Sequence, residues 1–166
     1  MNEQVPRFFV VMGVSGCGKT TVGQALAAHL DCPFYDGDDF HSPQNVAKMA
    51  SGMPLNDADR APWLASLAAL IEDHLDGGET AVLASSALKK RYRNQLRVSD
   101  QVTFIYLDGD FELIWQRMQA RPDHYMKPEM LRSQFEALEL PDNDEAIKIS
   151  IDQNVDDILA QILLAI

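Results

Sequence analysis

Short apolar runs alternate with amphipathic stretches along this chain of 166 residues. The runs have the length of buried β-strands, whereas the stretches between them repeat their apolar residues at helical spacing. The alternation predicts an α/β fold with a parallel sheet that carries helices on both faces. The expected strands are Phe8–Met12, Pro33–Tyr35, Thr80–Ala84, Val102–Leu107 and Ala146–Ile151.

Three apolar stripes mark the clearest helices. One lies within Lys19–Leu30, another runs from Trp63 to Leu75, and a third closes the chain between Val155 and Leu163. Gly77-Gly78 ends the second helix, and Pro62 is expected in its first turn. Ligands of such folds bind beyond the carboxyl ends of the strands, so the segments that follow the strands are the candidates for chemistry.

The segment after the first strand is a phosphate-binding loop. Gly13 to Thr20 reads GVSGCGKT and matches G-x-x-x-x-G-K-[ST] in full, between a strand and a helix. Its backbone N–H groups and the helix N-terminus attract phosphate, Lys19 reaches the β- and γ-phosphates, and the Thr20 hydroxyl ligates Mg²⁺. The sequence therefore predicts ATP and Mg²⁺ as ligands. The expected nucleotide contacts are Gly13, Ser15, Gly16, Cys17, Gly18, Lys19, Thr20, Thr21 and, further along, Arg117.

Other motifs narrow the class of phosphate-loop protein. The N-K-x-D segment with which GTPases read guanine is missing from the sequence. Asp108 follows an apolar run as a Walker B acid would, but Gly109-Asp110 and a helical stripe come directly after it, so we interpret it as a solvated acid at a strand end. Within the loop, we interpret Cys17 as a small filler residue, with a redox role as the alternative. The class of phosphate-loop protein that these motifs favour is the small kinases of metabolites and nucleotides.

Such a kinase needs an acceptor pocket, and three segments supply candidates. Asp36-Gly37-Asp38-Asp39-Phe40-His41 is an acidic turn that could orient an acceptor hydroxyl and take its proton, or could be a turn in water. Arg60 lies near the start of a helix and is suited to a carboxylate or phosphate. Ser85-Ser86 follows the third strand. Within the cations of residues 89–97, we expect Lys90 and Arg93 to point inward, and Lys89 and Arg91 to be solvated.

A cationic lid is expected between residues 117 and 137. Arg117 and Arg121 share a helix face, and Pro122 then breaks the helix. They either close on the transferred phosphate or form surface pairs with Glu112 or Asp123. The residues Asp152-Gln153-Asn154 are either a wall of the adenine pocket or a helix cap.

Composition limits the partners. The formal net charge is −11, which disfavours general binding to nucleic acid or to anionic membranes. The longest apolar runs are too short for a signal peptide or a membrane helix. Two cysteines make no disulfide framework, and this usage fits a reducing cytoplasm.

Taken together, these segments resemble the gluconokinases of the small phosphate-loop type, which are related to shikimate kinases. The resemblance rests on GVSGCGKTT, YDGDDFHSPQNVAKMASGMPLNDADRAPWL, SSALKKRYRNQLR, RMQARPDHYM and SQFEALELP, from Phe8 to Pro141. Shikimate kinases usually carry a glycine triplet after the third strand, where this chain has Ser85-Ser86-Ala87, and this favours gluconate as acceptor.

The resemblance implies one domain over residues 1–166, a five-stranded sheet in the order 2-3-1-4-5, phosphorylation of D-gluconate by ATP, and a homodimer. It implies Lys19, Asp38 and Arg121 as catalytic residues, and Thr20 with Asp36 at the metal. The implied acceptor contacts are Asp38, His41, Arg60, Ser86, Lys90, Arg93 and His124. Two alternatives stay open: a kinase of shikimate or another small metabolite, and a nucleotide-binding module without transfer activity.

Overall fold

The fold is built on five parallel strands. The computed structural model describes residues 5–120 and 128–166, and its strand order is β2-β3-β1-β4-β5, as predicted. Each predicted strand is present with ends within one residue of those expected, and every pairing in the sheet is parallel. The strands are β1 (Phe8–Met12), β2 (Phe34–Asp36), β3 (Ala81–Ala84), β4 (Val102–Asp108) and β5 (Ala146–Ser150).

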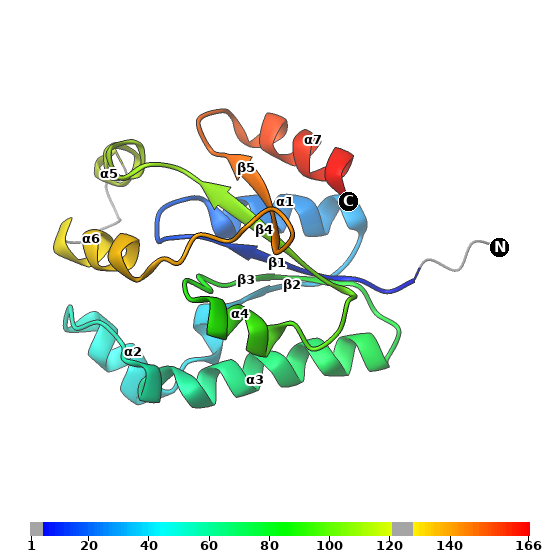
Figure 1. Cartoon of the computed structure of the whole chain (residues 1–166), viewed down its shortest axis with the longest axis horizontal. Helices are drawn as coiled ribbons and strands as arrows, with labels where there is room; N and C mark the ends of the chain where they lie inside the picture. The colour runs from blue at the N-terminus through cyan, green and yellow to red at the C-terminus, as the bar shows by residue number, and fades with distance from the viewer. Residues whose placement is uncertain (1–4, 121–127) are drawn as a thin grey trace.

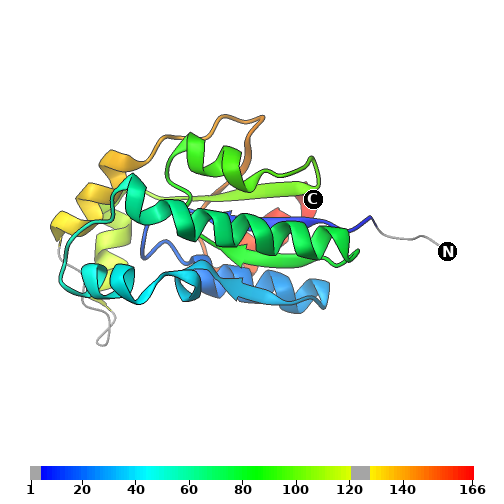
Figure 2. The same ribbon diagram turned by 90° about the horizontal axis from the view of Figure 1, so that it is seen from below.

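Helices cover both faces of this sheet. In Figure 1, α1 (Lys19–Leu30) and α7 (Val155–Ala165) lie on one face, and α3 (Asp57–Asp76) and α4 (Lys90–Leu96) on the other. Figure 2 shows α3 running along the outside of its face. Three further helices gather at the end of the molecule to which the strands point: α2 (Pro43–Ala50), α5 (Phe111–Gln119) and α6 (Pro128–Ala137).

The central strand β1 explains why two layers of helices are needed. All five of its residues are buried, and neighbouring side chains point to opposite faces. Phe8, Val10 and Met12 pack in a core with apolar residues of α3 and α4, whereas Phe9 and Val11 pack in a second core with residues of α1 and α7. A strand that is apolar on both faces therefore requires a helical cover on each.

Helix α3 begins earlier than its apolar stripe indicates. Asn56 caps it: its side chain accepts a hydrogen bond from the Asp59 N–H, and the Asp59 carboxylate accepts one from the Asn56 N–H. This reciprocal capping box fixes the start at Asp57. The prediction that Pro62 lies in the first turn is therefore wrong, since Pro62 lies inside the helix with its ring exposed. The predicted end at Gly77-Gly78 is confirmed.

Within residues 5–120 and 128–166, none of the helices is both long enough and apolar enough to span a membrane.

Candidate active site

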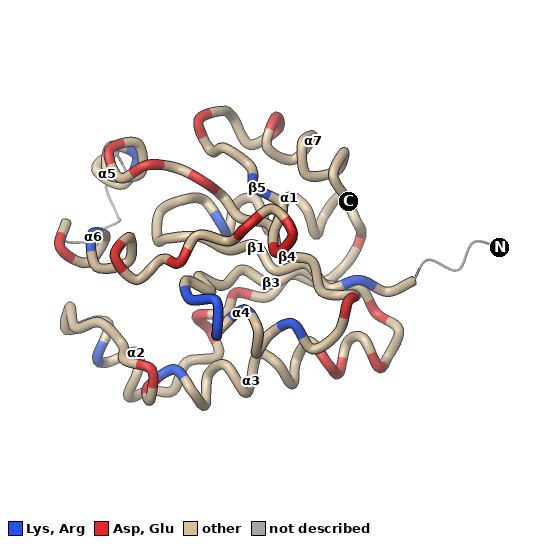
Figure 3. The backbone as a smooth tube through the Cα atoms, viewed as in Figure 1, with Lys and Arg blue, Asp and Glu red and all other residues tan. Residues whose placement is uncertain are grey.

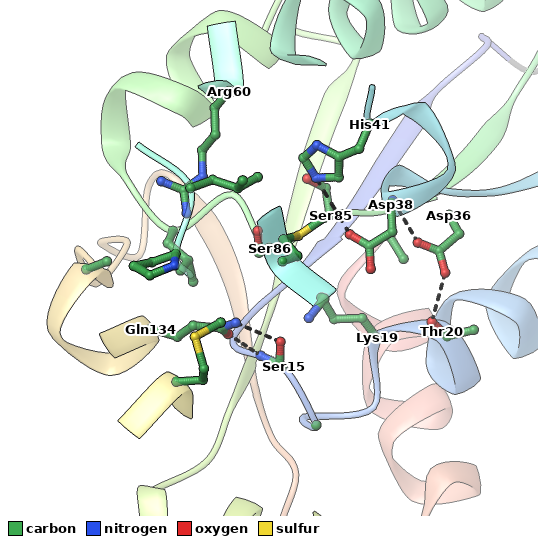
Figure 4. Close-up of a pocket in the computed structure, with 18 of the residues that line it drawn as sticks. Ser15, Lys19, Thr20, Asp36, Asp38, His41, Arg60, Ser85, Ser86 and Gln134 are labelled. Atoms are coloured by element: carbon green, nitrogen blue, oxygen red, sulfur yellow. Dashed lines mark hydrogen bonds and ion pairs between the residues drawn. The ribbon is translucent and has the colours of Figure 1, made fainter. Parts of the chain in front are cut away.

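A cleft of about 560 Å³ opens at the carboxyl ends of the strands, a size typical of small-molecule sites. It is lined by the loop after β1 with the first turn of α1, the turn after β2, the end of α2 and the loop that follows it, the start of α3, the loop after β3, and α6 (Figure 4). The sequence placed its candidate residues on these segments, and the fold brings most of them to one cavity.

The phosphate loop presents a helix terminus without a side-chain cap to this cleft. Gly18, the residue before α1, has φ +98°, a left-handed conformation that glycine tolerates and that gives the helix no side-chain cap. The first turn of α1 carries no acid. The first N–H groups of the helix therefore keep their capacity to bind an anion. Ser15, Gly16, Gly18, Lys19, Thr20 and Thr21 line the cleft.

Two of the predicted loop contacts support the loop from behind. Gly13 has φ +148°, and a Cβ atom there would lie 2.7 Å from the Cys17 sulfur. Gly13 and Cys17 are both buried, and neither lines the cleft. Burial raises the pKa of the Cys17 thiol, which favours its neutral form and agrees with the interpretation of Cys17 as a filler residue.

Lys19 bridges the loop from within. Its Nζ donates hydrogen bonds to the carbonyl oxygens of Gly13 and Val14, each at 3.0 Å. The ammonium charge is thereby fixed at the mouth of the loop. Lys19 and Asp38 line the same cleft. The positive charge of Lys19 therefore lowers the pKa of Asp38, against stronger effects that raise it.

Thr20 and Asp36 meet beside this loop. The Thr20 hydroxyl lies 3.4 Å from Asp36 Oδ2, and the other carboxylate oxygen of Asp36 accepts a hydrogen bond from the Asp38 N–H at 3.0 Å. Within the described residues there is no cluster of three His, Cys, Asp or Glu side chains that could hold a metal alone. One hydroxyl and one carboxylate next to a phosphate site nevertheless suit Mg²⁺, which takes few protein oxygens and several from phosphates and water.

Asp38 is held at the cleft by its neighbours. It belongs to the 3₁₀ turn η1 (Gly37–Phe40), and Trp63 of α3 donates a 2.7 Å hydrogen bond from its indole nitrogen to the Gly37 carbonyl. The His41 ring stacks on Trp63 with ring centroids 4.3 Å apart. Trp63 therefore ties the turn to α3 and also forms part of the cleft wall.

His41 faces Asp38 in its neutral form. Burial lowers the pKa of His41, and the positive charge of Arg60 lowers it further, against the opposing effect of Asp38. The Asn45 side-chain nitrogen lies 3.3 Å from His41 Nδ1. Because that amide nitrogen is a donor, Nδ1 accepts and the ring proton is assigned to Nε2, which lies 4.0 Å from Asp38 Oδ1.

The pKa of Asp38 is raised above the ordinary aspartate value. Loss of hydration and the negative charge of Asp36 raise the pKa of Asp38, and the positive charge of Lys19 lowers it by a smaller amount. Because 82% of the Asp38 side chain is accessible to solvent, the negative charge of Asp36 contributes more to this rise than burial does. A carboxylate of raised basicity is suited to accept a proton.

Arg60 brings an uncompensated charge into the cleft (Figure 4). Its Nη1 donates to the Tyr92 hydroxyl at 3.3 Å, and within the described residues no carboxylate lies within ion-pair distance of it. Ser85, Ser86 and Lys89 line the same cleft. The Ser85 hydroxyl is buried and has no hydrogen-bond partner among the described residues.

The structure corrects two predicted acceptor contacts. Arg93 points inward, but into the protein: it is fully buried, its Nε bonds Glu145 at 2.5 Å, and its other nitrogens bond the carbonyl oxygens of Ala87, Leu88 and Glu139. Four of its five N–H donors are thus occupied within the protein. Lys90 is exposed on the outer side of α4, outside the cleft. Lys89, expected in solvent, lines the cleft instead. Figure 3 shows this cationic run at the start of α4.

The lid residues are placed only in part. Arg117 lies outside the cleft on α5, where its Nη2 donates to the Ile151 carbonyl at 2.6 Å. Asn154 caps α7, which agrees with the cap interpretation of that segment. Asp108 ends β4 and lies 3.7 Å from Lys148, outside the cleft, as expected for a solvated strand-end acid. Arg121 and His124 lie outside the described residues.

Gln134 of α6 is a contact that the sequence reasoning missed. Its Oε1 accepts a hydrogen bond from the Ser15 N–H at 2.6 Å, and its Nε2 donates to the Ser15 hydroxyl at 2.8 Å (Figure 4). A phosphate-loop amide is thus engaged by the helix that carries the segment SQFEALELP. That segment is part of the resemblance, but its composition gave no sign that it reaches the loop.

Comparisons with known proteins show the family to which this chain belongs. A family model described as shikimate kinase matches residues 15–165. The thermosensitive gluconokinase of Escherichia coli K12 is 48% identical over 89% of this chain and 80% of its own, and the gluconokinase of Gluconobacter oxydans is 45% identical over 95% and 90%. The chain belongs to the gluconokinase family. A crystal structure of a gluconokinase from Sinorhizobium meliloti 1021 superposes with a TM-score of 0.88 at 37% identity, over 97% of this chain and 91% of that one.

Membership in the gluconokinase family makes the chain a phosphate-loop kinase. The family explains why the sequence has a complete phosphate loop and lacks a guanine-reading motif. It leaves the individual roles of the cleft residues to be argued from their geometry.

The burial of Arg93 predicts a structural role. Replacing it (Arg93→Met) leaves Glu145, whose side chain is only 6% exposed, as a buried unpaired charge. We expect the free energy of unfolding to fall by about 3–5 kcal/mol, measured by urea denaturation. The matched control is Lys148→Met, which removes a half-exposed cation paired with Asp108 and should cost less than about 1 kcal/mol. Equal small effects of both substitutions would contradict the structural role.

Proposed function

We propose that this chain transfers the γ-phosphoryl group of ATP to the 6-hydroxyl of D-gluconate, giving ADP and 6-phospho-D-gluconate. Relatives named gluconokinase support this acceptor, and the complete phosphate loop supports the nucleotide donor. The site residues divide into a donor half around Lys19 and Thr20 and an acceptor half around Asp38 and Arg60.

The observation that carries the acceptor class is the free charge of Arg60. In a protein of net charge −11, a guanidinium that faces a cleft without a carboxylate partner among the described residues is suited to an anionic ligand. Gluconate offers a carboxylate to Arg60. Its hydroxyl groups can bond Ser86 and the Ser85 hydroxyl, which has no partner among the described residues, and Lys89 adds a second positive charge. His41 would orient the side chain of Asp38 and would not contact the carboxylate of gluconate.

The proposed transfer is a direct in-line displacement. The 6-oxygen of gluconate forms a bond to the γ-phosphorus while the bond from that phosphorus to the β,γ-bridging oxygen breaks, and ADP leaves with the electron pair. Asp38 accepts the proton of the attacking hydroxyl. Lys19 stabilises the charge that develops on the phosphoryl oxygens, and the N–H groups at the start of α1 hold the β-phosphate.

Thr20 and Asp36 would hold Mg²⁺. The ion, when bound, offsets negative charge on the β- and γ-phosphates. We further propose that the segment from 117 to 137 closes over the cleft, that Arg121 meets the transferred phosphoryl group, that Arg117 contacts the adenine, and that His124 contacts the acceptor. Closure would keep water from accepting the phosphoryl group.

The expected single domain, the homodimer and the cytoplasmic location stay predictions. Both cysteines are free, which supports a reducing compartment as far as cysteine usage goes.

A panel of acceptors tests the proposed function. Turnover of ATP should be stimulated strongly by D-gluconate and little by shikimate, because the chain lacks the glycine triplet of shikimate kinases. Arg60→Ala should lower kcat/KM for D-gluconate by about 10²-fold or more, because a charged hydrogen-bond partner of the substrate is lost. The measurement is ADP release, coupled to NADH oxidation.

The same panel separates the alternatives. Stimulation by shikimate above that by D-gluconate would indicate the related kinase activity. Tight ATP binding without turnover in the presence of any acceptor would indicate a nucleotide-binding module.

The role of Asp38 predicts a pH profile. A base works in its deprotonated form, so kcat/KM should fall on the acid side, as pH drops through the Asp38 pKa, which lies above 3.8. Asp38→Asn should lower kcat by about 10²-fold or more. The matched control is Asp39→Asn, an exposed neighbour outside the cleft, which should keep kcat within about twofold of wild type. Near-normal turnover by Asp38→Asn would exclude Asp38 as the base.

A further inference from the structure

Tyr92 stands between Arg60 and Asp57, an acid about one helical turn before it. Asp57 and Arg60 are three residues apart at the start of α3, a spacing that normally lets an acid and an arginine pair. In the structure they do not. The Tyr92 hydroxyl, from α4, donates to Asp57 Oδ1 and accepts from Arg60 Nη1 at 3.3 Å.

Asp57 is occupied by other cations. Lys89 Nζ lies 3.3 Å from its Oδ1, and the guanidinium of Arg91 pairs with its Oδ2. One carboxylate thus faces Lys89, Arg91 and the tyrosine hydroxyl at once. The charge of Arg60 is consequently left uncompensated within the described residues.

The tyrosine ring completes this arrangement. Tyr92 is only 4% exposed and its ring lies between α3 and α4. The charged groups of Arg60, Lys89 and Arg91 lie 5.5, 5.8 and 5.5 Å from the ring centroid, within cation–π range. A buried ring cannot move far, so the hydroxyl is a fixed acceptor for Arg60.

We infer that Tyr92 is a positioning residue for the acceptor carboxylate, acting through Arg60. The Tyr92 hydroxyl donates its hydrogen bond to Asp57, so its oxygen accepts one from Arg60. This contact uses one of the five N–H donors of Arg60. A neutral partner fixes the direction of the guanidinium without neutralising it, and Arg60 lines the cleft. Holding a long side chain in place before binding reduces the entropy that the acceptor must offset. This inference rests on the proposed function, in which Arg60 binds the carboxylate of gluconate.

The test is Tyr92→Phe, which keeps the buried ring and removes only the hydroxyl. We expect kcat/KM for D-gluconate to fall about tenfold through a higher KM for gluconate, with kcat and the KM for ATP within twofold of wild type. The matched control is Tyr35→Phe, because the Tyr35 hydroxyl bonds His74 Nε2 at 2.8 Å and Tyr35 does not line the cleft. This control should leave gluconate kinetics within twofold of wild type.

A double-mutant cycle separates positioning from a general structural effect. In an Arg60→Met background, Tyr92→Phe should cause no further fall in kcat/KM, since its effect passes through Arg60. An equal fall in both backgrounds, an equal rise in the KM for ATP, or no fall in the single variant would overturn the inference. Failure of the proposed function looks different: the wild type would not phosphorylate D-gluconate, or Arg60→Met would leave kcat/KM unchanged.

Discussion

The start of α1, held at the carboxyl end of the central strand, is the constraint on which the site depends. Its N–H groups serve a ligand only while no protein side chain caps them, and Gly18 meets that condition in a left-handed conformation. The position of this helix end is set far from the ligand, by a strand whose residues are buried on both faces. The packing of the sheet therefore decides where phosphate can bind.

Opposite this positive terminus the chain arranges its charges unevenly. The acidic turn places Asp36 and Asp38 close enough to raise the pKa of Asp38, while Arg60 is kept apart from Asp57 by a neutral phenol. Both arrangements reduce stability locally. The carboxylates of Asp36 and Asp38 repel each other, and the guanidinium of Arg60 lacks a carboxylate partner among the described residues. Within the described residues, the cleft therefore holds a carboxylate of raised pKa and a guanidinium with no carboxylate at ion-pair distance, the two groups that the proposed reaction would use.

Features that depend on local sequence pattern could be predicted from the sequence. The burial of individual side chains and the contacts between distant residues could not. Strands and the phosphate loop follow from periodicity and a contiguous motif, and the strand order came from the family resemblance. Lys89 and Lys90 were assigned to the wrong environments, and Arg93 points inward as expected but does not reach the cleft. A cluster of cations shows charge but does not show which member the core surrounds. Helix α4 begins at Lys90, so Lys89 still has extended backbone and reaches the cleft. Gln134 was missed because its contact with Ser15 joins residues 119 positions apart.

The hydrogen bonds between Gln134 and Ser15 attach α6 to the phosphate loop. A backbone N–H has a single proton to give, and at Ser15 a carboxamide oxygen 2.6 Å away holds it. A phosphate oxygen that accepted a hydrogen bond from this N–H would displace the Gln134 carboxamide, and α6 would lose one of its two hydrogen bonds to Ser15. A nucleotide bound in this way would therefore compete with α6 for the Ser15 N–H.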